Sequence, residues 1–564
     1  MKRKMVAMLL SVVIVGSMVT ACGKSVETAT SNYETSNMAV AEYVEEAYSD
    51  NEAGAAKTTG NVDFAAPSAA TSVEPGMAYE ERCDYEYKEI ARASSNEKYN
   101  STQENDWISV EKKALSTFAA DVDTASYSNF RRMVLDGYDL YSIPADAIRT
   151  EEMINYFTYN YEEPDKDEVF GVTSQVSVCP WNRDNLLMTI GVNTATLDSR
   201  DIPDCNIVFL VDVSGSMRGA QKLPLIQKSM AMLTDKFDEN DRISIVTYAS
   251  GVETVLNGCS GDNSRKIIRA FDKLSAGGST NGGDGILRAY EIAEENFIED
   301  GVNRVIICSD GDFNVGLTTQ RELENLITEK KESGIFLSTL GFGMGNYSDV
   351  TMETLADKGN GNYAYIDDLT EAKKVLVDEM SSTFVTVAKD VKFQVEFNPA
   401  AVADYRLVGY ENRVMSSRDF TDDTKDGGEL GAGHQVTVVY EICPVENEEE
   451  TDLKYQNKKR TVKGSEYDEY CTMSIAYKEP AGNRSRYLEY PINYNNYTNR
   501  PSDDFNLAVA VAQASLAIKG SEFIVDYSAE EAIEDSYRTI RRLEKKYDDE
   551  YVSEFADLLE ELSY

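Results

Sequence analysis

The chain has 564 residues, of which 42% are hydrophobic, and a formal net charge of −43 at pH 7. A single core rarely organises more than about 250–300 residues, so we expect several domains. The negative charge argues against a nucleic-acid partner, because the phosphate backbone would repel such a surface. It also argues against a basic membrane-binding patch and favours solubility.

Eight cysteines and a single histidine, His434, limit the chemistry that the chain can perform. No two cysteines have CxxC spacing, so we do not expect a zinc or thioredoxin-like site. Two pairs, Cys179 with Cys205 and Cys443 with Cys471, could form disulfides, and the sequence leaves both open. A Ser-His-Asp or Cys-His enzyme would need the sole imidazole, and no partner nucleophile is evident beside it. We therefore predict that the chain is not an enzyme and has no small-molecule substrate.

Residues 1–22 predict an export signal. Three cationic residues precede the apolar run 5–19, which is short for a membrane span, since a span needs about 20 apolar residues. The run ends in Val19-Thr20-Ala21-Cys22, which resembles the bacterial lipobox. That resemblance implies cleavage before Cys22 and acylation of its thiol and of the new amino terminus. A plain secretory signal that happens to contain a cysteine is the alternative.

Acylation of Cys22 would place the protein at a membrane surface. Several acyl chains on one residue are enough for stable anchoring, whereas one chain is marginal. We expect a lipid anchor in the cell membrane or outer envelope, with the folded part outside the cytoplasm. Residues 23–105 are rich in Ala, Ser, Thr, Asn and Glu and lack apolar periodicity through Ser72, which predicts a disordered acidic tether.

Residues 106–165 begin the folded part as a helical region. Helices are predicted at 126–135 and 145–157, the second beginning beside Pro144. Two acidic residues before the first helix, Asp121 and Asp123, could be mistaken for metal ligands. Because such residues equally cap helices or bind arginines such as Arg131, we leave them out of the candidate site.

Strands with alternating apolar residues occur on both sides of a central segment. The first group lies in residues 166–203 and the second in residues 384–500. Strands that flank a domain on both sides can pair with each other, so we expect one β-sandwich built from both groups. Residues 501–564 are predicted to be helical, with intramolecular packing preferred over a coiled coil with another chain. Residues 170–200 alternate, with Val172, Val176 and Val178 on one face, and the expected strands are 186–192, 391–397, 405–410, 436–442 and 472–477.

The central segment, residues 204–383, alternates strands and helices, which predicts an α/β fold with a doubly wound, mostly parallel sheet. Its first strand, 206–211, is almost wholly apolar and rich in β-branched residues, as in a strand that is buried on both faces. The expected strands are 207–211, 243–248, 253–256, 305–308, 336–340 and 363–366. The expected helices are 225–237, 264–274, 283–296, 319–332, 349–358 and 369–380.

Oxygen-bearing side chains follow the first strand of this segment. Asp212, Ser214 and Ser216 alternate in a loop at the carboxyl end of the strand, where open α/β sheets bind ligands. Carboxylate and hydroxyl oxygens, without sulfur or imidazole, suit a hard cation such as Mg²⁺. The sequence therefore predicts a metal site at this edge of the sheet.

The Asp-x-Ser-x-Ser pattern after a buried strand resembles the von Willebrand factor type A (VWA) domain and its metal-ion-dependent adhesion site. Such a site has two further pieces, and both are present: a threonine loop with Thr280, and Asp310 after a second apolar strand. The resemblance implies that Ser214, Ser216 and Thr280 bind the metal directly. It implies that Asp212 and Asp310 act mainly through bound water, and that strand 253–256 is an antiparallel edge.

The implied ion is Mg²⁺, or alternatively Mn²⁺ or Ca²⁺. An open coordination position would accept an acidic side chain of a protein partner. The stretches 118–132 and 148–157, and later 405–413 and 426–435, look like the N-terminal VWA-associated region and the C-terminal domain of a group of bacterial VWA lipoproteins. The resemblance thus covers nearly everything after the tether.

Together these features predict a membrane-anchored surface lipoprotein that binds a protein partner through a metal ion. The first alternative is an envelope scaffold or assembly factor whose metal is purely structural. The second is a hydrolase, since an aspartate after an apolar strand can be a nucleophile of the haloacid-dehalogenase kind. That family needs a second carboxylate two residues later, and here the position is Ser214.

Overall fold

The computed structural model describes residues 99, 101, 103–120, 123–166, 168–197, 202–280, 282–311, 320–343, 349–445, 468–480, 482, 484–547 and 549–563. The predicted export signal with Cys22, and the predicted tether as far as residue 98, lie outside the described residues. None of the helices in the described ranges combines the length and the hydropathy that crossing a bilayer requires.

The α/β part is built on a six-stranded sheet with the strand order β10-β9-β8-β5-β6-β7. Every neighbouring pair is parallel except β6 with β7. This confirms the predicted doubly wound sheet, and it makes β7 an antiparallel edge strand that is longer than the predicted 253–256. The strands are β5 (Cys205–Asp212), β6 (Arg242–Tyr248), β7 (Val252–Ser260), β8 (Val302–Ser309), β9 (Phe336–Phe342) and β10 (Tyr363–Ile366).

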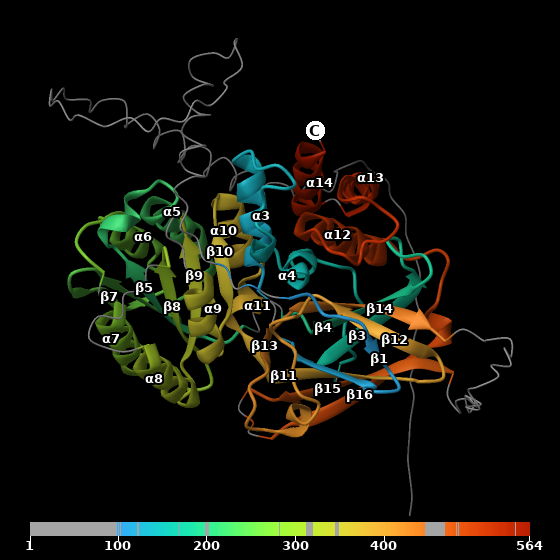
Figure 1. The fold of residues 1–564 in the computed structure, drawn as a ribbon. Coiled ribbons are helices and arrows are strands. Elements are labelled where there is room, and N and C mark those ends of the chain that lie inside the picture. Colours follow the sequence, from blue (N-terminus) through green and yellow to red (C-terminus); the bar gives the residue numbers. More distant parts are fainter. Residues whose placement is uncertain are drawn as a thin grey trace, which may run out of the picture. The chain divides into compact units, whose positions relative to one another are not determined.

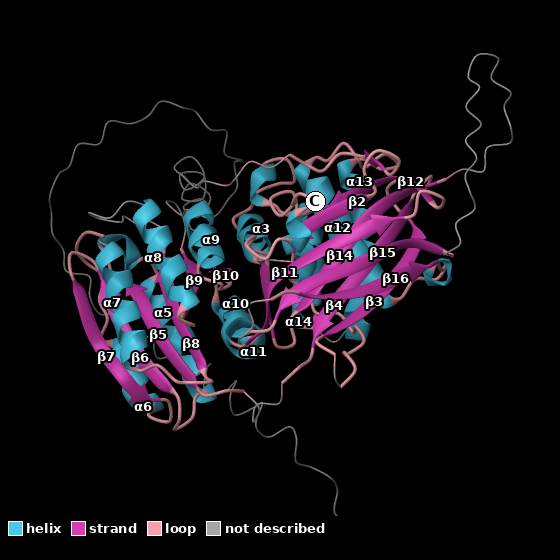
Figure 2. Cartoon of the chain, turned by 90° about the horizontal axis from the view of Figure 1, so that it is seen from below, coloured by secondary structure: helices cyan, strands magenta, loops and turns pink. Residues whose placement is uncertain are grey.

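Helices cover both faces of this sheet, as Figures 1 and 2 show. Alternate side chains of β5 pack on opposite layers: Phe209 packs with helices α5 and α6, and Leu210 packs with α7 and α9. All residues of β5 are buried, as expected for a strand inside a parallel sheet. The helices are α5 (Leu223–Leu233), α6 (Ser264–Asp272), α7 (Gly282–Glu295), α8 (Gln320–Glu332) and α9 (Asp349–Lys358).

Strands from both sides of the α/β part form two antiparallel sheets, with orders β1-β12-β14-β4-β3 and β13-β11-β15-β16. Strand β4 precedes the α/β part and pairs with β14, which follows it. Side chains of both sheets share one core, so the predicted sandwich built from both flanks is confirmed. The strands are β1 (Ile108–Ser109), β2 (Leu115–Ala119), which pairs with β11, β3 (Phe170–Val178), β4 (Leu186–Thr194), β11 (Thr386–Phe397), β12 (Val402–Val408), β13 (Gly428–Gly431), β14 (Gln435–Pro444), β15 (Glu469–Lys478) and β16 (Arg486–Asn493).

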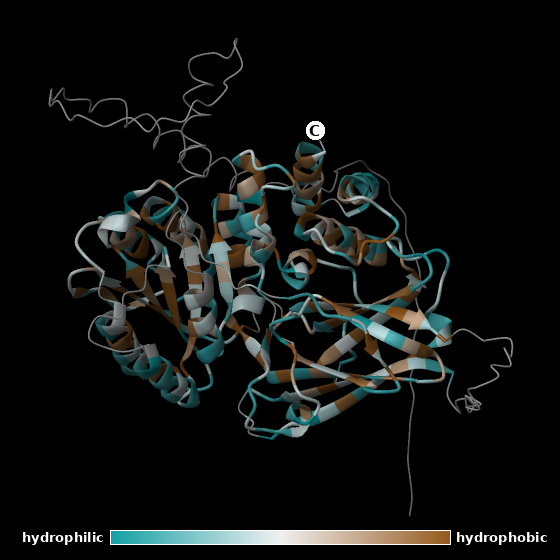
Figure 3. Ribbon diagram, in the orientation of Figure 1, coloured by the Kyte–Doolittle hydropathy of each residue, from teal (hydrophilic) through white to brown (hydrophobic). Residues whose placement is uncertain are grey.

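A helical layer covers the other face of the β14–β4 sheet. Leu187 and Val439 point out of the sandwich core and join a second core with helices from both ends of the folded chain. Helix α12 is buried along most of its length, whereas α13 is largely hydrophilic (Figure 3). The helices are α3 (Ala125–Leu135), α4 (Thr150–Asn155), α12 (Asp503–Lys519), α13 (Ala529–Tyr547) and α14 (Glu550–Leu562).

Two helices that the sequence predicts as continuous are interrupted, so those predictions are wrong. The predicted helix 145–157 is a short 3₁₀ turn, η2 (Ala145–Ala147), followed by α4, because Arg149 is extended between them. The side chain of Arg149 binds Glu152 at 2.5 Å and Glu353 at 3.1 Å, which holds that break. The predicted helix 369–380 is divided into α10 (Leu369–Lys373), a π-helical turn η5 (Lys374–Asp378) and α11 (Met380–Phe384).

The cysteines that could pair do not form disulfides. Cys179, Cys205 and Cys471 carry free, buried thiols, so neither Cys179 with Cys205 nor Cys443 with Cys471 is cross-linked. The fold is therefore held by packing and by polar contacts in the described part of the chain. Asp123 makes one of these polar contacts. It binds Arg413 at 3.1 Å and not Arg131, which the sequence had offered as an example of an arginine partner.

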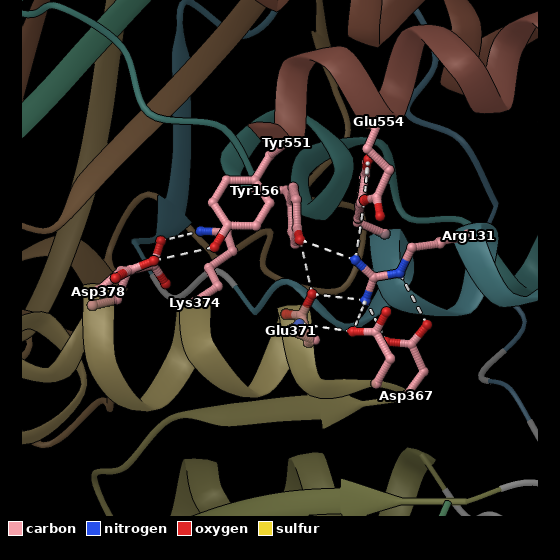
Figure 4. A network of polar contacts seen from close by, with 11 residues as sticks. Arg131, Tyr156, Asp367, Glu371, Lys374, Asp378, Tyr551 and Glu554 are labelled. Atoms are coloured by element: carbon pink, nitrogen blue, oxygen red, sulfur yellow. Dashed lines mark hydrogen bonds and ion pairs between the residues drawn. The ribbon is translucent and has the colours of Figure 1, made fainter. Parts of the chain in front are cut away.

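Arg131 of α3 is fully buried and joins three parts of the chain (Figure 4). Its guanidinium donates to Asp367 after β10 at 3.0 Å, to Glu371 of α10 at 3.0 Å and to Glu554 of α14 at 3.1 Å. The hydroxyl of Tyr156 also donates to Glu371, at 2.8 Å. Removing one partner from such a buried network leaves uncompensated charge, which typically costs about 3–5 kcal/mol. The α/β part is thus fastened to both terminal helical regions.

We expect the charge of Glu371 to make stability depend on pH. Burial raises the pKa of Glu371 to about 7, although Arg131 acts to lower it. An acid whose pKa is higher in the folded than in the unfolded state stabilises the fold at low pH and loses that stabilisation as the pH rises through the folded pKa. In the Glu371→Gln variant, the fall in unfolding free energy between about pH 5.5 and about pH 8 should shrink by about 2 kcal/mol.

Urea unfolding at both pH values measures this difference. Glu534→Gln is the matched control, because the side chain of Glu534 is 40% exposed. If the unfolding free energy of Glu371→Gln depended on pH as that of the wild type does, the raised pKa of Glu371 would be contradicted.

Candidate metal centre

Four of the five predicted ligands lie at one edge of the sheet. Asp212 is the last residue of β5, and Ser214 and Ser216 follow it into the 3₁₀ turn η3 (Gly215–Arg218). Asp310 directly follows β8, which is parallel to β5 and beside it. The side chains of Asp212, Ser214 and Asp310 are almost fully buried, whereas Ser216 is exposed. The polar cluster therefore lies beneath the surface and opens at Ser216.

The threonine loop is fastened to the loop after β5 by two backbone hydrogen bonds. Gly277 N donates to the carbonyl of Val213 at 2.8 Å, and Gly215 N donates to the carbonyl of Gly278 at 3.0 Å. Thr280 is two residues further along this loop and is half-buried. Gly278 has a φ of +89°, and a Cβ there would lie 2.6 Å from Ser250 Oγ, so the loop requires glycine at this position.

Hydrogen bonds orient the oxygens of Asp212. One carboxylate oxygen accepts from Ser214 N at 2.7 Å, and the other accepts from Ser309 Oγ at 3.3 Å. The hydroxyl oxygens of Ser214 and Ser216 lie 2.9 Å apart. Ser309 ends β8 and was missed by the sequence analysis; its only signal was a hydroxyl directly before Asp310. Through its bond to Asp212, Ser309 links β5 and β8, the two strands that carry the carboxylates.

The site concentrates negative charge away from water. Burial, together with the charge of Asp310, raises the pKa of Asp212 to about 6, although hydrogen bonds from Ser214 act to lower it. Burial and these two carboxylates also raise the pKa of Tyr248, at the end of β6, well above its usual value. A cation at this place would relieve the cost of burying two like charges.

A second residue that the sequence analysis missed is Lys222, which precedes α5. Its ammonium nitrogen lies 2.9 Å from Asp310 Oδ2, so the cluster already accepts a positive charge. Hydroxyl and carboxylate oxygens are hard ligands that suit Mg²⁺, Mn²⁺ or Ca²⁺. The residues at this edge therefore fit the divalent cation that the sequence implies.

Comparison with protein families agrees with this architecture. The model of the von Willebrand factor type A domain matches residues 206–378, and a model described as von Willebrand factor matches residues 93–189. The model described as "Uncharacterized protein YfbK, C-terminal" matches residues 382–563. The matched ranges thus include the α/β sheet, the later strands of the sandwich and the C-terminal helices.

Two relatives show how far the likeness extends. The uncharacterized protein YfbK of Escherichia coli (strain K12) is 39% identical over 435 residues, which is 76% of this chain and 75% of YfbK. The human inter-alpha-trypsin inhibitor heavy chain H4 is 29% identical over 164 residues, 28% of this chain and 17% of that protein. The second likeness thus concerns a small part of a much longer protein.

Solved structures with similar parts are more distant. A von Willebrand factor type A protein from Catenulispora acidiphila is 14% identical, with 69% of this chain and 89% of that chain covered and a TM-score of 0.38. Proximal thread matrix protein 1 from the mussel byssus, solved with a zinc-occupied MIDAS motif, is 21% identical over 33% of this chain and 46% of that chain, with a TM-score of 0.27. From its family matches and its likeness to YfbK, we conclude that the chain belongs to the YfbK family of VWA-domain proteins.

Proposed function

We propose that this protein binds a divalent cation at its VWA domain and, through that ion, an acidic side chain of a protein partner. The proposed ligands are Asp212, Ser214, Ser216, Thr280 and Asp310. The observation that carries the proposal is the pair of buried carboxylates at the carboxyl edge of β5 and β8. The hydroxyl groups of Ser214 and Ser216 contact each other in the adjoining loop, and Ser216 is exposed at the surface. We propose Mg²⁺ as the ion, with Mn²⁺ or Ca²⁺ as alternatives.

The bound ion would supply an electrophilic centre for a carboxylate. Magnesium takes about six oxygen ligands and usually keeps several waters, one of which a partner can replace. The chain's own residues hold this arrangement: Ser214 N and Ser309 Oγ orient Asp212, and Lys222 binds Asp310. We propose a binding role and not a catalytic one, in keeping with a VWA domain.

We also propose that Cys22 carries a lipid anchor, which would hold the folded part at the cell membrane or outer envelope, outside the cytoplasm. The support is the lipobox-like Val19-Thr20-Ala21-Cys22 after a short apolar run. Acylated protein would remain with membranes after high-salt washing, and Cys22→Ser protein would be released.

Metal binding should stabilise the protein. When a chelated sample is supplied with Mg²⁺ at about a hundred times its Kd, the unfolding free energy should rise by about 2–3 kcal/mol, because the ion binds only the folded state. Thr280→Val removes a proposed ligand with little change in size, so its melting temperature should respond much less to the ion. Differential scanning calorimetry measures both.

Thr328→Val is the matched control, since the hydroxyl of Thr328 bonds within α8 to the carbonyl of Glu324 at 2.8 Å. A wild-type melting temperature that ignores Mg²⁺, Mn²⁺ and Ca²⁺ alike would refute the metal site.

Partner binding should depend on the ion. Capture of envelope proteins by the detergent-solubilised full chain, with Mg²⁺ or with chelator, should yield a partner that is lost in chelator. Asp212→Ala should reduce its recovery at least about tenfold, which corresponds to about 1.4 kcal/mol. Asp272→Ala on the exposed side of α6 should leave recovery unchanged. Circular dichroism checks that both variants are folded.

Undiminished capture by folded Asp212→Ala would instead favour the scaffold alternative, in which the sandwich and the helices bind the partner and the metal is structural.

A further inference from the structure

Lys222 brings a positive charge into a site otherwise built from acidic and hydroxyl side chains. Its ammonium lies 2.9 Å from Asp310 Oδ2, and the two side chains are only 14% and 2% exposed. A pair so removed from water is weakly screened, so its charges act strongly on anything else bound in the same cluster. The pair therefore differs from a solvent-exposed ion pair, whose charges water and salt screen strongly.

The fold holds this lysine in place. Its backbone N donates to the carbonyl of Gly219 at 3.0 Å, and its carbonyl accepts from Ile226 N at 3.0 Å, which fixes the start of α5. Its aliphatic stem runs past Gly343, where an added Cβ would lie 2.4 Å from both Cγ and Cε of Lys222. Gly343 has a φ of +81°, and its carbonyl accepts from Tyr365 Oη at 2.8 Å. The stem thus packs so closely on Gly343 that any side chain at this position would displace it.

The charges at the site show what the lysine changes. Among the residues of the site that the structure describes, Asp212 and Asp310 contribute two negative charges, and Lys222 offsets one of them. A divalent cation therefore leaves this described set of residues with one net positive charge, which a partner's carboxylate neutralises. If the lysine were absent, the ion alone would neutralise the two aspartates, and a further carboxylate would make the site negative again.

We propose that Lys222 weakens binding of the divalent ion and strengthens binding of a carboxylate to the ion once it is bound. The inference rests on the proposed function, because it concerns the same metal site. Repulsion between an ammonium and a divalent cation in a partly buried cluster should weaken ion binding about tenfold, which corresponds to about 1.4 kcal/mol. Lys222 is a positioning and selectivity residue that acts through Asp310.

The test is a titration of chelated, full-length protein with Mn²⁺, followed by electron paramagnetic resonance. Lys222→Met keeps the stem that lies against Gly343 and removes the charge. Lys222→Gln keeps a donor for Asp310 and also removes the charge, so it separates the charge from the hydrogen bond. Both variants should bind Mn²⁺ about tenfold more tightly than wild type. Lys236→Met, on the exposed 3₁₀ turn after α5, should bind as wild type does.

The second measurement uses acetate as the probe carboxylate on Mn²⁺-saturated protein, followed by the fall in water proton relaxation as acetate displaces bound water. Acetate should bind wild type and Lys236→Met about tenfold more tightly than either Lys222 variant. Opposite changes in ion and acetate affinity are the signature of the proposed role, because a misfolded variant would lose both.

Wild-type protein that binds no Mn²⁺ would refute the metal site itself, and this inference with it. Wild-type binding of Mn²⁺ together with unchanged or weaker binding by both Lys222 variants would leave the metal site standing and overturn the role of Lys222. Tighter Mn²⁺ binding by the variants with unchanged acetate affinity would overturn the second half of the proposal.

Discussion

The burial of two like charges, Asp212 and Asp310, is the constraint on which this structure depends. The parallel pairing of β5 with β8 places both carboxylates at one edge of the sheet, where neither is open to water. Hydrogen bonds from Ser214 and Ser309 and the ammonium of Lys222 offset part of the cost, and a bound divalent ion would reverse the sign of the charge that remains on these residues. The loops around the two carboxylates thus place the groups that offset their charge.

The edge that carries the proposed metal site belongs to a domain that is built firmly into its surroundings. The α/β part interrupts a β-sandwich, since β4 before it pairs with β14 after it. Arg131 then fastens β10 and α10 to helices α3 and α14 through the buried carboxylates of Asp367 and Glu371 and the half-buried carboxylate of Glu554 (Figure 4). Buried ion pairs add little net stability but are costly to break, so they favour one arrangement of these elements over others. A partner that binds at Ser216 would therefore bind a surface whose supports reach both terminal helical regions.

The sequence predicted the sheet and most of the site because both leave local signals. The apolar run before Asp212 marks β5, and the oxygen pattern after it marks the loop. Lys222, Ser309 and Gly343 escaped prediction because they matter only through contacts across the fold. The break at Arg149 has the same origin, since Glu353 that holds it is remote in sequence. Strand β16 was missed because Ile492 is its only fully buried residue, so it lacks strong apolar alternation.

The most direct test of the central claim is a crystal structure of the protein grown with Mn²⁺, with anomalous diffraction used to locate the ion. We expect one anomalous peak within about 2 Å of the hydroxyl oxygens of Ser214, Ser216 and Thr280, a distance typical of small divalent ions. Asp212 and Asp310 should lie further from the peak and bind the ion through water. Well-ordered loops around these residues with no peak between them, or with Thr280 turned away from Ser214, would contradict a metal site at this edge of the sheet.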